Sequence, residues 1–97
     1  MNYSLHPEAT RDLAEILAFY QKSATPRVAA NFLDEFERVA KLLAENSGFG
    51  TPFDLPRRIY PLRTYPYSVI YRQVEGGVRV LTVRHQSRYP RYGQGRN

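Results

Sequence analysis

The sequence predicts an α+β fold, in which an N-terminal strand and an antiparallel helical hairpin pack on a small antiparallel β-sheet that ends in a basic tail. Three observations predict this class. Apolar residues recur with a helical period up to residue 45, and from residue 57 they alternate with the period of a strand. The chain has 97 residues, enough for one hydrophobic core and too few for two. We therefore expect a single domain over residues 1–97, with residues 86–97 as a loosely ordered tail.

The opening residues predict a short strand and a first helix. Residues 2–5 are expected to be extended, and a helix over residues 7–22 starts with Pro7 and Glu8, both favoured in a first turn. One apolar stripe of this helix consists of Leu13, Ile16, Leu17 and Tyr20. Glu8 and Asp12 lie off the stripe, four residues apart, and we interpret the pair as a solvated helix face.

A second helix follows after a very short link. Thr25 is a favourable N-cap, Pro26 suits the first helical position, and the segment 46–48 (Asn-Ser-Gly) ends the helix. Its apolar face consists of Ala29, Phe32, Phe36, Val39 and Leu43, backed by Leu33 and Ala40. Two amphipathic helices joined by so few residues are expected to lie antiparallel.

The second half predicts three strands after a glycine- and proline-rich loop over residues 48–56. The runs are 57–63, 67–74 and 78–84. Pro61 favours an edge position or a bulge for the first run, and the turn at 75–77 (Glu-Gly-Gly) favours an antiparallel meander. Strict alternation places Val78, Val80 and Thr82 on one face and Arg79, Leu81 and Val83 on the other. Tyr67 and Tyr71 are expected to pack in the core.

Charge is divided unevenly along the chain. Residues 1–56 carry a net charge of −3, whereas residues 57–97 carry nine arginines, one acid and a net charge of +8. Arginine forms forked contacts with phosphate and carboxylate, so the second half favours a polyanion or an acidic partner. The candidate binding residues are Arg57, Arg58, Arg63, Arg72, Arg84, Arg88 and Arg91.

Several classes of function are disfavoured. The sequence has no cysteine, and its two histidines, His6 and His85, lie far apart, so we expect neither a metal site nor a cofactor. It has no phosphate-binding glycine loop, no apolar stretch long enough to span a membrane, and no signal-peptide pattern at its start. We expect a cytoplasmic protein that does not bind a membrane.

The segment 84–92 carries the residues that could perform chemistry. His85 or Tyr92 could move protons and Arg88 could neutralise a phosphorane, as metal-free phosphodiester cleavage requires. The alternative is a solvated basic tail, or a contact surface for nucleic acid or an acidic partner without any catalysis.

The order of elements, together with several short motifs, resembles the RelE/ParE superfamily of bacterial toxins from type II toxin-antitoxin modules. The resemblance covers nearly the whole chain. The segments that carry it are Leu5-His6-Pro7-Glu8-Ala9 with Asp12-Leu13 and Ile16, Leu42-Leu43-Ala44-Glu45-Asn46, Tyr67-Ser68-Val69-Ile70-Tyr71-Arg72, and the run from Val78 to Arg88.

The resemblance implies a growth-inhibiting toxin and a cognate antitoxin whose disordered segment masks it. One branch of the superfamily cleaves messenger RNA on the ribosome, and its late arginine and tyrosine match Arg88 and Tyr92. The lysine pair of that branch falls near Ile59 and Pro61, and its strand arginine falls on Ser68, so half of the constellation is absent.

The other branch, ParE-like, poisons DNA gyrase without known hydrolytic chemistry. Its long helical hairpin, and its last strand that runs into a His-Gln-Ser sequence, are closer to this chain. We therefore expect a ParE-like toxin with gyrase as target, with a ribosome-dependent mRNA endonuclease as the alternative and an inert relative as a third possibility. The antitoxin is expected to be acidic, to add a helix or strand near the edge at 57–63, and to anchor an apolar group between helices and sheet.

Overall fold

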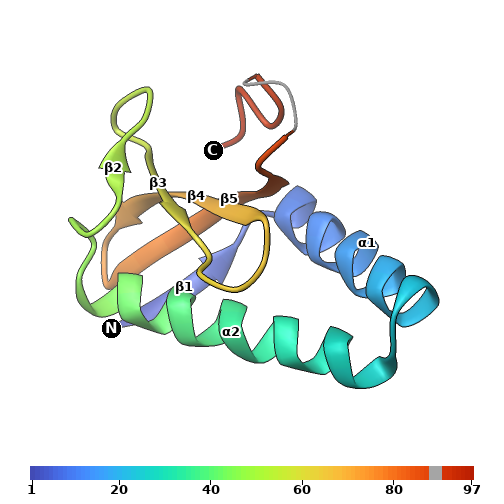
Figure 1. The fold of residues 1–97 in the computed structure, drawn as a ribbon. Helices are drawn as coiled ribbons and strands as arrows, with labels where there is room; N and C mark the ends of the chain where they lie inside the picture. Colours follow the sequence, from blue (N-terminus) through green and yellow to red (C-terminus); the bar gives the residue numbers. More distant parts are fainter. Residues whose placement is uncertain (88–90) are drawn as a thin grey trace.

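The computed structural model describes residues 1–87 and 91–97 and confirms the α+β class (Figure 1). The elements are β1 (Asn2–Leu5), α1 (Pro7–Ser23), α2 (Pro26–Glu45), β2 (Thr51–Pro52), β3 (Arg58–Pro61), β4 (Tyr67–Val74) and β5 (Gly77–His85). The predicted N-cap of α2 is present, since Thr25 Oγ1 accepts the Val28 N–H. At the start of α1, His6 Nδ1 accepts the Glu8 N–H, a cap that was not predicted from the sequence. In the described part of the chain, no helix is long and apolar enough to cross a membrane.

The five strands form one sheet in the order β1-β5-β4-β3-β2. The extended residues 2–5 form β1, which pairs with β5 in parallel at one edge of the sheet, and β3, β4 and β5 form the predicted antiparallel meander. β2 covers the side of β3 away from β4 only at Arg58 and Ile59, which pair with Pro52 and Thr51, so the predicted edge position holds at Tyr60 and Pro61 and not at the start of the strand. The partner strand has only two residues, so the glycine- and proline-rich loop that contains it showed no strand periodicity.

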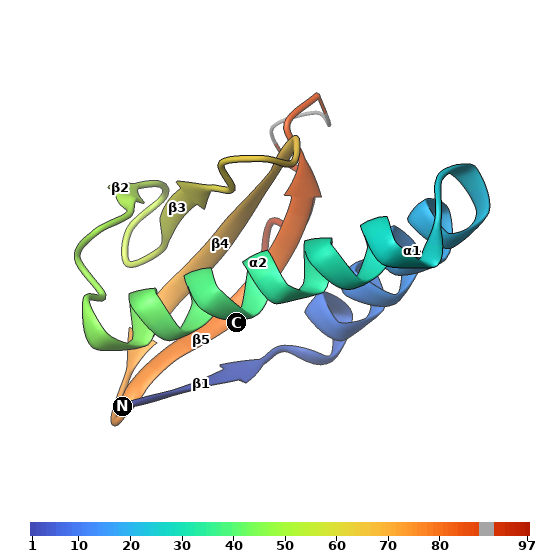
Figure 2. The ribbon, with the colours of Figure 1, turned by 60° about the horizontal axis from the view of Figure 1, so that its bottom comes forward.

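Both helices cover the same face of the sheet (Figure 2). Phe32, Phe36 and Leu43 of α2 pack against Tyr67 and Tyr71 of β4 in this core, as the apolar stripes predicted. Tyr71 is fully buried, and its hydroxyl accepts the Gly50 N–H at 2.9 Å and donates to the Ser47 carbonyl at 2.7 Å. The segment that leaves α2 is thereby fixed to the centre of the sheet.

A register shift in β5 alters which side chains face the helices. Ile70 pairs with Thr82 and Tyr71 pairs with Val80, so Leu81 is an extra residue between the two pairs. Beyond this bulge the alternation reverses, and Val83 joins Val78 and Val80 in the helix-side core. The strict alternation expected from the sequence is therefore wrong after Val80. Residues 80–83 are all uncharged, so their sequence does not show where the alternation reverses.

The other face of the sheet is covered by residues 91–97. Leu81 and Thr82 are buried although they lie outside the helix-side core. Gly93 lies so close to Thr82 that a Cβ atom at this position would overlap the threonine hydroxyl and methyl groups. The sequence predicted a loosely ordered segment over 86–97; the structure gives its last seven residues specific contacts with the sheet and α1.

Candidate functional site

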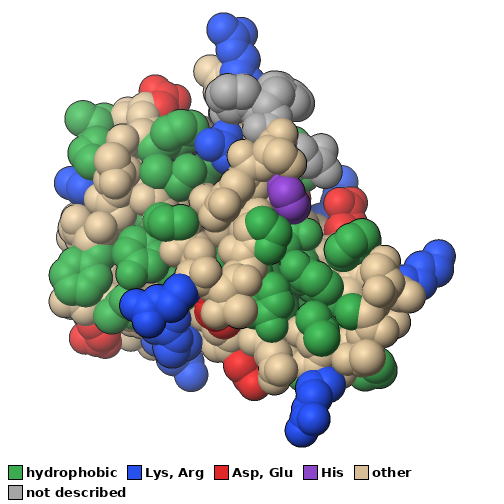
Figure 3. Space-filling model, viewed as in Figure 1, with side chains coloured by type: hydrophobic (Ala, Val, Ile, Leu, Met, Phe, Trp, Pro, Cys, Tyr) green, Lys and Arg blue, Asp and Glu red, His purple; other side chains and the backbone are tan. Residues whose placement is uncertain are grey.

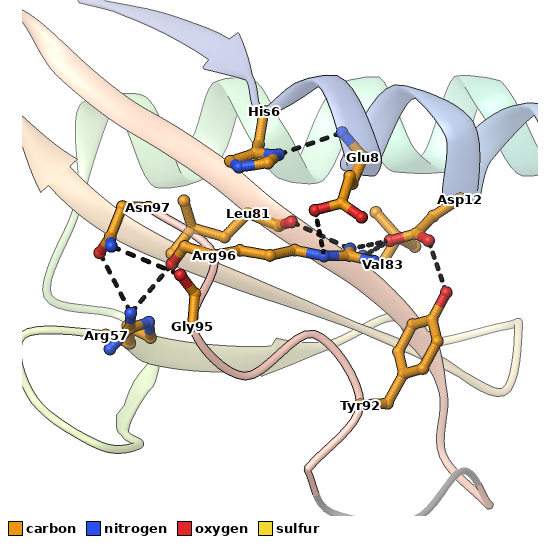
Figure 4. A network of polar contacts seen from close by, with 10 residues as sticks. All are labelled: His6, Glu8, Asp12, Arg57, Leu81, Val83, Tyr92, Gly95, Arg96 and Asn97. Atoms are coloured by element: carbon orange, nitrogen blue, oxygen red, sulfur yellow. Dashed lines mark hydrogen bonds and ion pairs between the residues drawn. The ribbon is translucent and has the colours of Figure 1, made fainter.

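A buried carboxylate on α1 holds the C-terminal segment in place (Figure 4). Asp12 is 4% exposed. Its Oδ2 accepts the Val83 N–H at 3.1 Å and a hydrogen bond from Arg96 Nη1 at 2.6 Å, and its Oδ1 accepts the Tyr92 hydroxyl at 2.7 Å. We call Asp12, Tyr92 and Arg96 the tail clamp.

The interpretation of Glu8 and Asp12 as a solvated helix face was wrong for Asp12. Glu8 is exposed and lies 3.7 Å from Arg96 Nε, whereas Asp12 is buried against β5. Arg96 also donates to the Leu81 carbonyl at 3.2 Å. Local sequence could not reveal this role, because the partners of Asp12 lie more than 70 residues further along the chain.

Tyr92 is protonated and engaged in this arrangement. Burial first, and then the hydrogen bond to Asp12 and its negative charge, raise the pKa of the Tyr92 phenol above its ordinary value of 10.0. The guanidinium of Arg96 lies 5.2 Å from the centre of the Tyr92 ring. A phenol with a raised pKa stays protonated at neutral pH and is a poor general base. The Tyr92 hydroxyl is therefore better suited to a structural role than to proton abstraction.

His85 ends β5 beside a groove between α1 and the sheet. Its Nδ1 accepts the Ser87 N–H at 3.1 Å and lies 2.7 Å from the Ser87 hydroxyl oxygen. Its ring stands edge-on to Tyr67, with the ring centres 5.1 Å apart. The groove has a volume of about 350 Å³ and is lined by Asp12, Glu15, Ile16, Phe19, Tyr20, Pro66, Tyr67, Val83, Arg84, His85 and Tyr92.

Of the three candidate catalytic residues, the structure therefore brings His85 and Tyr92 to one groove. Arg88 lies outside the described residues. Among the residues that are described, no group of three or more histidine, aspartate or glutamate side chains is placed to hold a metal ion.

Two of the seven candidate binding arginines meet at the end of the chain, on the sheet face opposite the helices. Arg57 Nη2 donates to the Arg96 carbonyl at 2.9 Å and to Asn97 Oδ1 at 3.1 Å. Arg72 Nη2 donates to the backbone oxygen of Asn97 at 3.1 Å. Arg79, which was not among the seven, joins them through its Nε, which donates to the same oxygen at 3.1 Å.

Arg79 and Arg96 are the basic site residues that sequence reasoning missed. For Arg79 a signal was available, since the turn at Gly76 and Gly77 places it directly opposite Arg72. For Arg96 no local signal exists, because its role depends on the return of the tail across the sheet.

The other candidate arginines are dispersed. Arg58 donates to the Gly50 carbonyl at 2.8 Å, and Arg84 lies over the Phe53 ring at 5.1 Å. Arg63 is exposed in the β3–β4 turn, where its backbone N–H donates to Glu35 Oε2 at 2.8 Å. Arg91 is exposed beside Phe53 and Arg57 at a pocket of about 180 Å³. The predicted basic surface is therefore several separate groups rather than one patch.

The α+β fold is the one expected from the resemblance, and comparison with known proteins shows the family. The profile of the family described as ParE toxin of type II toxin-antitoxin system, parDE, matches residues 3–90. The chain belongs to this ParE toxin family.

Comparison with solved structures supports the same fold. A chain from the chromosomal ParDE toxin-antitoxin system of P. aeruginosa is 24% identical in sequence and superposes with a TM-score of 0.75. The match covers 88% of this chain and 95% of that one. No curated protein sequence matches the chain.

Proposed function

We propose that the protein is the growth-inhibiting toxin of a toxin-antitoxin pair, that it acts in the cytoplasm by poisoning DNA gyrase, and that a cognate antitoxin neutralises it. Membership of the ParE family is the observation that carries this proposal. The geometry supports a toxin that acts by binding. Of the two described residues considered for proton transfer, Tyr92 donates its hydroxyl to Asp12, and Nδ1 of His85 contacts Ser87.

Purified gyrase provides the direct test. Gyrase, plasmid DNA, ATP and the protein are incubated together, and the DNA is analysed after detergent and protease treatment. We expect linear DNA to accumulate with the dose of protein, and to disappear when purified antitoxin is added first. Full supercoiling activity and no linear DNA at an excess of the folded protein would refute gyrase as the target.

The ribosome-dependent endonuclease makes the opposite prediction for two variants. If the protein binds and does not cleave, Arg88→Ala and Tyr92→Phe should still arrest growth when expressed at wild-type levels. If both variants lose growth arrest while they still bind the antitoxin, the nuclease alternative replaces our proposal. Antitoxin binding serves as the control for folding, because Tyr92→Phe removes a contact of the tail clamp.

We place the apolar anchor of the antitoxin in the groove beside His85. Phe19 is 55% exposed there, Ile16 and Tyr67 add apolar lining, and Arg84 contributes a positive charge beside the acidic Asp12 and Glu15. Figure 3 shows hydrophobic side chains gathered on this side of the molecule, over α1.

The anchor is tested by a matched pair of variants. Phe19→Ala should weaken antitoxin binding by about 2 kcal/mol or more, which is the size of a buried aromatic contact at an interface. Leu55→Ala is the control, since Leu55 is 69% exposed in the loop before β3, away from the groove. Equal affinities of the two variants would exclude the groove as the anchor site.

A further inference from the structure

Three arginines form a row across neighbouring strands on the sheet face opposite the helices. Arg72 of β4 and Arg79 of β5 are direct cross-strand partners. The pairing of Arg58 with Tyr71 places the preceding residue, Arg57, beside Arg72. Because neighbouring strands lie about 4.8 Å apart, the row spans about 10 Å. Like charges directly opposite each other destabilise a sheet, so this row calls for a compensating anion.

Oxygen atoms of residues 96–97 now meet the row. The Arg96 carbonyl and Asn97 Oδ1, which accept from Arg57, are neutral amide oxygens. A single backbone oxygen of Asn97 accepts from both Arg72 and Arg79. The side-chain carboxylate of Asp54, which is 63% exposed, lies 3.5 Å from Arg57 Nη1. Guanidinium groups bind anionic oxygens more strongly than neutral ones, so a phosphate could take the place of the two amide oxygens at Arg57.

We propose that Arg57, Arg72 and Arg79 form a binding site for the phosphates of a nucleic-acid backbone, which residues 96–97 occupy until the nucleic acid displaces them. The forked guanidinium suits phosphate oxygens. The row lies on the face of the sheet, where the backbone groups of β4 are already paired on both sides, so a peptide cannot add there as a strand. Contacts of this kind recognise charge and not sequence.

The tail clamp sets the strength of the competition. The Arg96 side chain is bound to Asp12 at 2.6 Å, and this contact holds residues 96–97 close to the row. The intact protein should therefore bind nucleic acid more weakly than the open site would, in proportion to the fraction of molecules with the tail displaced. A site covered by the tail predicts this competition, whereas a simple basic surface does not.

The first experiment measures binding of the full-length protein to a short fluorescent DNA duplex of arbitrary sequence, by anisotropy, between about 50 and 200 mM NaCl. The double variant Arg72→Gln/Arg79→Gln is compared with Arg11→Gln/Arg27→Gln, which removes the same charge from exposed positions on the two helices. We expect the strand variant to bind about tenfold more weakly than the helix variant, with a salt dependence shallower by about 2 in the log–log slope. Equal affinities and slopes would overturn the proposal.

The second experiment removes residues 96–97. Deletion takes away one positive charge, so general electrostatic attraction predicts weaker binding. Our proposal predicts tighter binding and a steeper salt dependence, because three guanidinium groups become accessible. Binding that is unchanged or weaker in a folded truncated protein, checked by circular dichroism, would refute the occlusion. If the truncated protein does not fold, the comparison of the two double variants decides the proposal.

An acidic peptide is the alternative ligand, and a third experiment tests it. Polyglutamate is added to the protein and the labelled DNA. Displacement of the DNA only at a large excess of polyglutamate supports a phosphate site. Direct binding of polyglutamate that depends on Arg72 and Arg79, without any binding of DNA, would reassign the row to an acidic protein partner. None of these assays contains gyrase, so their outcome does not depend on whether gyrase is the target.

Discussion

At the scale of single residues, Asp12 connects three parts of the chain that lie far apart in sequence. Its carboxylate accepts hydrogen bonds from β5, from Tyr92 and from Arg96, so α1, the sheet and the C-terminal segment share one buried charge. A buried carboxylate is strongly destabilising when it loses its cationic partner. The pair with Arg96, whose side chain is only 11% exposed, therefore fixes the position of the tail.

We predict that Asp12→Asn lowers the free energy of unfolding by about 2 to 4 kcal/mol, because the partly buried Arg96 guanidinium loses its counter-charge. Urea unfolding measures the change. Asp34→Asn, at an exposed position of α2, is the control and should change stability by no more than about 0.5 kcal/mol. Similar effects of the two substitutions would show that the clamp contributes no stability.

The residue scale also shows what the sequence can and cannot predict. Tyr67 and Tyr71 were expected in the core and lie there, because alternation within β4 determines their face. Asp12 was misjudged because its position on the helix is compatible with solvent, and only the return of the tail makes it buried. A polar residue whose partners are distant in sequence carries no local pattern that distinguishes it from a surface residue.

At the scale of elements, α2 holds the turn between β3 and β4 through one carboxylate. Glu35 Oε2 accepts the backbone N–H groups of Arg63 at 2.8 Å and Thr64 at 3.1 Å. Burial acts to raise the pKa of Glu35, but the hydrogen bonds from Thr64 and Arg63 and the charge of Arg38 outweigh it, so the pKa lies below its ordinary value of 4.5. The ionised form is therefore favoured by folding.

This lowered pKa predicts a pH dependence of stability. The contribution of the Glu35 charge is fully present above the unfolded-state pKa and is lost as the pH falls through the lower folded-state pKa. The wild type should exceed Glu35→Gln in stability at pH 7, and the difference should shrink as the pH falls below 4.5. Chemical unfolding of both proteins over this range measures it. A difference independent of pH would mean that the charge of Glu35 is not involved.

The C-terminal segment depends on a glycine for its approach to the sheet. Gly93 has a φ of +82° and lies against Thr82, whereas Gly95 has a φ of +91° and has open space around it. We predict that Gly93→Ala destabilises the protein by about 2 to 3 kcal/mol and Gly95→Ala by about 1 kcal/mol, since only the first adds a steric overlap to the backbone strain. Thermal unfolding and hydrogen exchange of β5 compare them. Equal effects would place Gly93 away from Thr82.

Sequence periodicity succeeded for long elements and failed for short irregular ones. Both helices and the three meander strands were predicted close to their observed bounds, because each has several apolar residues in phase. The two-residue strand β2 and the bulge at Leu81 were not predicted. Each depends on pairing with a partner strand and not on the composition of its own segment.

At the scale of the whole molecule, the acidic first half and the basic second half are arranged in layers. The helices cover one face of the sheet, and the C-terminal segment lies on the other (Figure 1). Arg72 and Arg79 contact this segment through Asn97. The sequence predicted the basic character of the second half. It did not predict that its arginines would separate into several groups, because that depends on strand register and on the path of the tail.

This separation of charge predicts salt-sensitive association with an acidic antitoxin. Long-range attraction accelerates encounter and is screened by salt, whereas an apolar anchor at Phe19 is not. We expect the association rate constant to fall at least tenfold between about 0.1 and 1 M NaCl, while the dissociation rate constant changes little. Surface plasmon resonance with purified antitoxin measures both. An unchanged association rate constant would exclude electrostatic steering.

The central claim is that this ParE family member arrests growth through DNA gyrase. The most direct measurement is induced expression of the chain alone in a bacterial host, followed within minutes by pulse labelling of DNA and protein synthesis. Our account predicts that DNA synthesis stops first and that cells become filamentous while translation continues. A prompt stop in translation with DNA synthesis intact would contradict it, and would make Arg88, His85 and Tyr92 the residues to test for RNA cleavage.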